Sequence, residues 1–259
     1  MNHSLSHPFQ HIFPLLIICL LLLPLSALQA ADSFDMGNQA YMRKDYDAAI
    51  TYYRQAAKNR GLSASLLYNL GNSYARSGKI GPAVLAYEQA LLLAPTDPDI
   101  HTNLESIRKA NGLYQPNQPW WQRVISILGA DQWLLLATIS FALFSGSLLI
   151  MTLVRKSWSI KILKTVAVIT SVCTLLALPS ALLSYRHRQD GVVLTSTRLK
   201  ISPFAEAAST GAIQEGRIVT PIKTYKDFVF VLDKKGRKGW LSTRELGKIG
   251  QLDTGKPVS

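Results

Sequence analysis

Apolar residues gather in three long runs, and these runs predict how the chain is organised. The first run, Ile12–Leu25, is short for a membrane span and is followed by small residues, a pattern typical of a signal peptide. We expect cleavage near Ala30, so that residues 1–30 form a signal peptide. An uncleaved membrane anchor is the alternative. In either case the residues that follow are predicted to cross the membrane.

The second and third runs, Trp133–Val154 and Ile162–Tyr185, are each long enough to span about 30 Å of hydrocarbon as a helix. They predict transmembrane helices over residues 131–155 and 162–185, joined by a short loop over residues 156–161. Basic residues without any acidic partner gather in and beside this loop: Arg155, Lys156, Lys161 and Lys164. The positive-inside rule places such a loop in the cytoplasm. Both flanking regions are then expected on the periplasmic side of a bacterial inner membrane.

Residues 111–130 precede the first predicted span. Asn111–Pro119 has the composition of a linker, whereas Trp120–Leu128 mixes aromatic and apolar residues as a short helix on a membrane surface does. Four of the five tryptophans flank the two spans, where indole rings prefer the bilayer interface.

Between the signal and this linker, residues 32–110 read as helices that repeat every 34 residues. The middle copy is the most complete and has small, aromatic and proline positions at fixed spacings: Leu67, Leu70, Gly71, Tyr74, Gly78, Ala83, Tyr87, Ala90 and Pro95. A helical period of this length is typical of tetratricopeptide repeats. The copy before it is weaker. Pro98–Lys109 is predicted to be a single helix that caps the open end of the solenoid.

The resemblance to tetratricopeptide repeats implies that proteins bind here, as an extended peptide or a helix, on the face formed by the first helix of each repeat. On that face the spacing places five candidate protein-binding residues: Asn38, Asn69, Asn72, Arg76 and Asn103. Amides of this kind can hold a peptide backbone, and Arg76 can hold a carboxylate. The alternative interpretation is that Asn69 and Asn103 only satisfy backbone groups between helices.

After the third apolar run the pattern changes to a period of two, which indicates strands. Short β-rich runs separated by turns predict a small all-β barrel over residues 190–250, followed by a tail over residues 251–259. The order of its turns and strands resembles a bacterial SH3 domain, through Lys200–Pro203, Phe228–Val231 and Gly236–Leu241.

Three aromatic residues, Phe228, Phe230 and Trp240, are the candidates for the core or the ligand-binding face of this SH3-like barrel. Leu246 is expected to close the barrel after a short 3₁₀ turn over Thr243–Glu245. The first turn lacks the Arg and Gly that are usual in the family, so no family ligand site is carried over to it.

The distribution of charge along the chain limits the classes of partner that each part can bind. The 259 residues carry 28 basic and 16 acidic side chains, a net charge of +12, and the mean hydropathy is +0.13. The repeats hold 9 basic and 8 acidic residues, residues 111–185 hold 5 and 1, and the part from residue 186 onward holds 14 and 7. The repeats therefore offer no nucleic-acid footprint, and the charge near the spans reflects topology. The basic excess of the barrel fits anionic membrane lipid, an acidic cell-wall polymer such as peptidoglycan, or an acidic protein.

The sequence carries no motif typical of a catalytic, cofactor-binding or metal site. We therefore expect no cofactor and no enzymatic activity. Cys19 and Cys173 both lie in apolar runs, which argues against a disulfide scaffold or a zinc site. The oligomeric state stays open.

A signal, tetratricopeptide repeats, two spans and an SH3-like barrel, in this order, resemble the BatE-type proteins of the Bacteroides aerotolerance operon. The resemblance covers nearly the entire chain. It implies a multi-domain membrane protein with an all-α solenoid, a two-helix transmembrane hairpin and a small all-β barrel. It also implies a scaffold in a stress-related envelope complex with von Willebrand factor A proteins and a MoxR-type ATPase. The alternative function is a cell-wall-binding sensor or tether that acts through the basic barrel.

Overall fold

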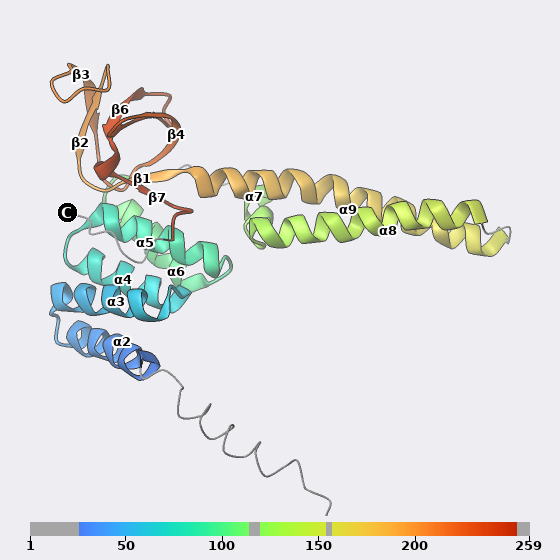
Figure 1. Cartoon of the computed structure of the whole chain (residues 1–259), viewed down its shortest axis with the longest axis horizontal. Helices are drawn as coiled ribbons and strands as arrows, with labels where there is room; N and C mark the ends of the chain where they lie inside the picture. The colour runs from blue at the N-terminus through green and yellow to red at the C-terminus, as the bar shows by residue number, and fades with distance from the viewer. Residues whose placement is uncertain (1–25, 114–119, 154–156, 253–259) are drawn as a thin grey trace, which may run out of the picture.

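The computed structural model describes residues 26–113, 120–153 and 157–252. Within these ranges the chain forms a helical repeat region, one short helix, a long two-helix hairpin and a curled antiparallel sheet (Figure 1). The predicted signal peptide lies outside the described residues except for positions 26–30, and so does the tail beyond residue 252.

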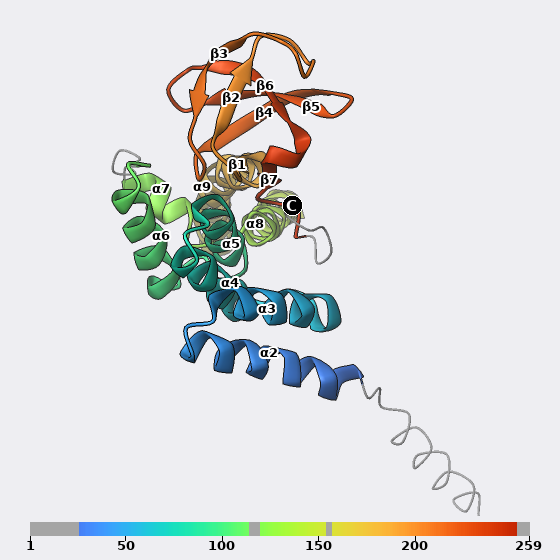
Figure 2. The ribbon, with the colours of Figure 1, turned by 90° about the vertical axis from the view of Figure 1, so that its left-hand side faces the viewer.

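The repeat region is built from consecutive antiparallel helices. They are α2 (Ser26–Met42), α3 (Tyr46–Arg60), α4 (Ala64–Arg76), α5 (Ile80–Leu93) and α6 (Pro98–Ala110). The first four form two pairs, α2 with α3 and α4 with α5, and α6 packs against α5 at the end of the stack (Figure 2). The residue before α6, Asp97, caps the helix: its side chain accepts hydrogen bonds from the backbone N–H groups of residues 99 and 100. Helix α6 starts where the capping helix was expected to start and ends one residue later.

A contact between a glycine and a tyrosine closes each helix pair. A Cβ atom at Gly37 would lie 2.6 Å from the ring of Tyr53, and one at Gly71 would lie 2.8 Å from the ring of Tyr87. Both rings are almost completely buried. Because glycine has no side chain, the first helix can approach the aromatic ring of the second. The repeated glycine and tyrosine positions therefore have one physical cause, the close packing of two helices.

Helices α8 (Ala130–Leu153) and α9 (Ser157–Gln189) run side by side as an antiparallel hairpin, with the short α7 (Trp120–Ile125) near its base (Figure 1, Figure 2). Helix α9 already begins at Ser157, so five residues of the predicted loop over residues 156–161 are helical. It also continues for four residues past the predicted end of the span at residue 185. At the base, Trp133 Nε1 donates a hydrogen bond of 2.8 Å to the carbonyl oxygen of Ile125.

Small side chains fill the interior of the hairpin, and large apolar side chains face outward. The buried positions are Ala130, Ala137, Ser140, Ser147, Ala167, Thr170, Ala177, Ser180 and Ala181. By contrast, Leu135 is 61% exposed and Leu175 is 68% exposed. In water the leucines would be the residues to bury, whereas a seam of small residues is typical of helices that pack within lipid. Both helices are long enough and apolar enough to cross a membrane.

The C-terminal sheet has seven strands in the described part of the chain, all paired antiparallel in the order β3-β2-β6-β5-β4-β1-β7. They are β1 (Gly191–Val193), β2 (Thr197–Lys200), β3 (Ser209–Ile213), β4 (Ile218–Tyr225), β5 (Phe228–Asp233), β6 (Lys238–Ser242) and β7 (Leu246–Lys248). The expected 3₁₀ turn over Thr243–Glu245 is present, and Leu246 joins the core just after it. That core is aliphatic and comprises Val193, Leu199, Ile213, Val219, Val229, Val231, Leu241 and Leu246.

The three aromatic candidates for the core or the ligand-binding face, Phe228, Phe230 and Trp240, do not belong to this aliphatic cluster. Strand β5 alternates, so its two valines, at 229 and 231, turn inward while Phe228 and Phe230 turn to the other face. The rings of Phe230 and Trp240 lie 5.2 Å apart on neighbouring strands. Lys223 Nζ lies 5.3 Å from the centre of the first ring and 5.4 Å from the second. The cation of Lys223 therefore covers a ring pair in which Trp240 is buried and Phe230 is half-buried.

The repeat region and the C-terminal sheet share one hydrophobic core. Val192, Ile218 and Ile249 belong to the same buried cluster as the residues of α5. Helix α5 lies so close to the sheet that a Cβ at Gly81 would lie 2.3 Å from the carbonyl oxygen of Leu194. Because apolar side chains of both parts meet here, neither surface is exposed to water.

The small-residue seam of the hairpin leads to a first prediction. Replacing Ala177, which is fully buried, by Leu inserts three carbon atoms into a packed interface. We expect Ala177→Leu to lower the free energy of unfolding of the full chain by about 1–3 kcal/mol, measured by denaturation with SDS in mixed micelles. Leu175→Ala, which alters an outward side chain, is the control and should change it less. Equal tolerance of both substitutions would contradict the observed packing.

Candidate functional site

The face formed by the first helices of the repeats carries a network of asparagine and tyrosine side chains. The hydroxyl of Tyr53 donates a hydrogen bond of 2.8 Å to Oδ1 of Asn38. One repeat later, the hydroxyl of Tyr87 donates a hydrogen bond of 2.6 Å to Oδ1 of Asn72. Each pair joins the two helices of one repeat, because the asparagine lies on the first helix and the tyrosine on the second.

The remaining two asparagines join successive repeats. Asn69 Nδ2 donates to Oδ1 of Asn38 at 3.3 Å, and Asn103 Nδ2 donates to Oδ1 of Asn72 at 2.8 Å. Asn103 also lies 3.1 Å from the hydroxyl of Tyr68. Both residues thus connect neighbouring first helices, as the alternative interpretation has it, but through side chains and not through backbone groups.

These bonds determine how two of the amides are oriented. Oδ1 of Asn38 and Oδ1 of Asn72 each accept two hydrogen bonds, so the Nδ2 group of each must lie at the opposite end of the side chain. Neither Nδ2 group donates to any of the described residues, and both side chains are half-buried. Two amide donors, one per repeat, are therefore available on this face.

The comparison with known protein families agrees with this periodicity. Residues 64–97 match the tetratricopeptide repeat. The matched range contains α4 and α5, the helix pair in which Tyr87 meets Gly71 and Asn72. This family is a non-catalytic fold that binds other proteins, consistent with the expectation that the chain is not an enzyme. No curated protein is similar enough to the chain to count as its relative.

Arg76, the fifth candidate, lies at the end of α4 in the matched tetratricopeptide repeat. Its side chain is exposed, and a hydrogen bond with Tyr41 of α2 raises the pKa of the guanidinium above its ordinary value. The ring of Tyr41 packs against that of Tyr46 at 5.4 Å. The structure therefore places Arg76 beside aromatic rings of the preceding repeat, where its charge is permanent and open to solvent.

A buried charge cluster lies on the other side of the same repeat. Glu88 of α5, with its side chain only 4% exposed, pairs with Nη2 of Arg108 on α6 through Oε1. Its second oxygen lies 3.2 Å from Nε2 of His187. Burial opposes ionisation of Glu88, but the charges of Arg108 and His187 outweigh it and hold the pKa of the carboxyl well below its usual range.

His187 connects this cluster to the end of α9, past the apolar stretch that ends at Tyr185. Its other ring nitrogen, Nδ1, lies 3.7 Å from Oδ2 of Asp190. Burial would lower the pKa of His187, but hydrogen bonds with Asp190 and Glu88, and the charges of both, raise it to about 9. The histidine is therefore positively charged at neutral pH and joins the apolar hairpin to the repeats.

Sequence reasoning did not find the cluster. The one available signal was Glu88 itself, a lone carboxylate in the otherwise apolar stretch of α5. Its partners lie 20 and 99 residues further along the chain, too far for any local spacing to reveal them. Within the described residues, no group of three or more His, Cys, Asp and Glu side chains has the arrangement of a metal site.

The position of His187 predicts how stability depends on pH. The folded-state pKa of His187, about 9, exceeds the ordinary value of 6.5. Its stabilising contribution to the free energy of unfolding is therefore complete below pH 6.5 and is lost as the pH rises to 9. We expect the thermal unfolding midpoint of the detergent-solubilised chain to fall over this range. The slope should be shallow, because 41% of the side chain is exposed and water weakens its ion pairs.

Three other charged groups lie near Glu88 or His187, namely Arg108, Asp190 and Lys234. A pair of variants shows whether the pH dependence comes from His187 and not from these groups. His187→Gln should flatten the decline between pH 6.5 and 9, whereas His101→Gln, at an exposed histidine, should leave it unchanged. An unchanged slope in the His187→Gln variant would refute the role of this residue.

Proposed function

We propose that this protein is a membrane-anchored scaffold that binds partner proteins on the first-helix face of its repeats. The observation that carries the proposal is the pair of Nδ2 groups of Asn38 and Asn72, which recur with the repeat and have no acceptor among the described residues. An extended peptide or an exposed helix end offers carbonyl oxygens to such donors. Arg76 adds a positive charge for an acidic group of the partner.

The hairpin supports the membrane part of the proposal, because its large apolar side chains face outward and small side chains fill the interface between its helices. Because the helices are antiparallel, the repeats and the C-terminal sheet lie at the same end of the hairpin (Figure 1). The basic residues at its other end favour a cytoplasmic turn in a bacterial inner membrane, with both soluble parts on the periplasmic side.

We further propose that the C-terminal sheet is an SH3-like barrel and that the scaffold serves a stress-related envelope complex of the BatE type. The number of strands, their antiparallel pairing and the 3₁₀ turn before the last strand support the first part. The order of signal, repeats, hairpin and sheet supports the second. Partners of the von Willebrand factor A and MoxR-type ATPase classes belong to this proposal.

The binding face can be tested without removing its internal bonds. Asn38→Asp combined with Asn72→Asp keeps an oxygen for each tyrosine but replaces each amide donor by a carboxylate oxygen. The measurement is the amount of partner protein that is cross-linked in native membranes and recovered by affinity purification. We expect the double variant to recover at least about tenfold less partner than the unmodified chain does.

The matched control is Asn59→Asp, the same chemical change at an exposed position on α3. It should recover the partner as the unmodified chain does. Equal recovery with the double variant would show that the first-helix face does not bind the partner.

The proposed topology has a separate test. Alkaline phosphatase fused after Ser259 should be active, since the enzyme requires the periplasm, while a fusion in the basic turn near Lys156 should be inactive. The reverse pattern would place the repeats and the sheet in the cytoplasm.

A cell-wall tether is the second candidate function, favoured by 14 basic against 7 acidic residues from residue 186 onward. Since the sheet shares its core with α5, the full chain must be used to distinguish the two. Retention on purified sacculi in about 0.5 M salt, where simple charge attraction is screened, would favour the tether.

A further inference from the structure

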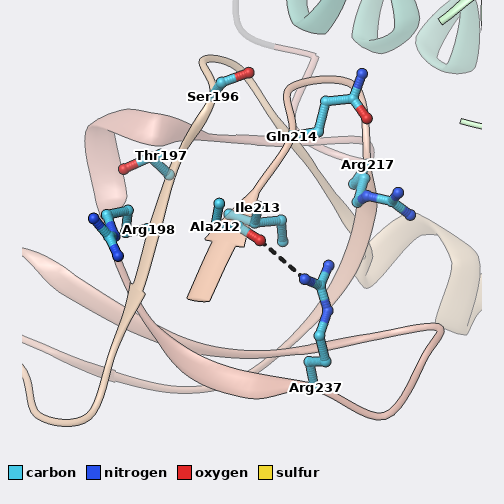
Figure 3. Close-up of a pocket in the computed structure, with 8 residues that line it drawn as sticks. All are labelled: Ser196, Thr197, Arg198, Ala212, Ile213, Gln214, Arg217 and Arg237. Carbon is cyan, nitrogen blue, oxygen red and sulfur yellow. Dashed lines mark hydrogen bonds between the residues drawn. The ribbon is translucent and has the colours of Figure 1, made fainter. Parts of the chain in front are cut away.

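A pocket of about 510 Å³ opens on the C-terminal sheet, and neither the three aromatic candidates nor any residue of the repeats lines it. Its lining comes from β2, from β3 and from the turns that precede β2, β4 and β6: Ser196, Thr197, Arg198, Ala212, Ile213, Gln214, Arg217 and Arg237. Figure 3 shows Ala212 and Ile213 in the middle, with Arg198 on one side and the other two arginines on the opposite side. This volume is typical of a small-ligand site.

One of the three arginines is already held in place. Arg237 Nε pairs with Oδ2 of the buried Asp233 at 2.7 Å, and its Nη1 donates to the carbonyl oxygen of Ala212 at 2.9 Å. Its charge is therefore balanced within the chain. It forms a fixed edge of the pocket.

The other two arginines have no such partner. Arg198 is exposed and Arg217 is half-buried, and the guanidinium group of neither makes a hydrogen bond or an ion pair with the described residues. No Asp or Glu is among the residues that line the pocket. Besides Asp233, which pairs with Arg237, the carboxylate of Glu245 is bonded to the lining: it accepts from Thr197 Oγ1 at 2.7 Å and from the backbone N–H of residue 242. Two positive charges therefore remain without a counter-charge around one hollow.

The polar lining adds donors around these charges. Ser196 Oγ accepts from the backbone N–H of Glu215 at 3.2 Å, which leaves its own hydroxyl proton to donate elsewhere. Gln214 is tied to the repeat region, because its Nε2 donates to the carbonyl oxygen of Asn111 at 2.9 Å. The pocket wall is thus anchored to the end of α6 and does not depend on the strands alone.

We propose that this pocket binds a phosphate group. Guanidinium groups bind phosphate and carboxylate oxygens through paired hydrogen bonds. A carboxylate is planar and presents both oxygens in one direction, which suits one arginine. A phosphate is tetrahedral and presents oxygens in several directions, so it can meet Arg198 and Arg217 on opposite sides of Ala212 and Ile213. Its double charge also matches the two unbalanced cations.

The test measures binding of pyrophosphate to the full chain in detergent by isothermal titration calorimetry at low salt. Arg198→Gln combined with Arg217→Gln should weaken this binding by at least about tenfold, since two charge-assisted contacts are lost. Lys238→Gln combined with Arg244→Gln removes the same charge from exposed positions outside the pocket. This control should weaken binding by less than about threefold. Unchanged unfolding midpoints show that both variants are folded.

Two outcomes would overturn the proposal. The first is an equal loss of affinity in both double variants, because binding would then follow net charge and not the pocket. The second is citrate binding as tightly as pyrophosphate, which would show that any multivalent anion suffices.

A comparison in nanodiscs identifies the source of the phosphate, and either result supports the site. If anionic phosphatidylglycerol weakens pyrophosphate binding relative to neutral lipid, and the pocket variant abolishes this difference, the lipid headgroup occupies the pocket. If the lipid makes no difference while the pocket variant still loses affinity, the phosphate comes from a soluble or polymeric ligand.

Discussion

Glu88 is the residue on which the arrangement of the molecule depends. A carboxylate in an apolar helix is costly to bury unless opposite charges meet it, and here those charges come from two other parts of the chain. Arg108 approaches from α6 and His187 from the end of the apolar hairpin. Because both must be present for the charge to be compensated, the positions of α5, α6 and α9 are tied to one another.

Helix α5 consequently faces three environments at once. Tyr87 packs against the first helix of its own repeat, Glu88 meets the charged partners, and Val84 lies in the cluster shared with the sheet. The helix is therefore the structural centre of the soluble part. The proposed binding face lies on α2, α4 and α6, whereas α5 is already in contact with the sheet and with the end of the hairpin.

The repeats, the apolar helices and the strands could all be predicted from the sequence, because each depends on a short period along the chain. The pair Gly71 and Tyr87 recurs 34 residues earlier as Gly37 and Tyr53, and α6 ends one residue beyond the predicted cap. Local alternation predicted β5 but not which of its faces is the core, so the core and the ligand-binding face both stayed open for Phe228 and Phe230. In the folded chain the core consists of aliphatic side chains from neighbouring strands.

For the candidate binding residues, too, the sequence predicted their place and the fold determined their hydrogen bonds. The sequence places four asparagines on the first-helix face: Asn38, Asn69, Asn72 and Asn103. Only the folded chain shows which of their amide groups form hydrogen bonds with tyrosines or with each other and which do not. The sequence alone determined the elements, their order and the distribution of charge, since these follow from periodicity and composition. The tertiary structure decided the shared core, the pairing of Glu88 with His187, and the pocket around Arg198 and Arg217. These depend on contacts between residues far apart in the chain, and no local pattern specifies which distant group will balance a buried or unpaired charge.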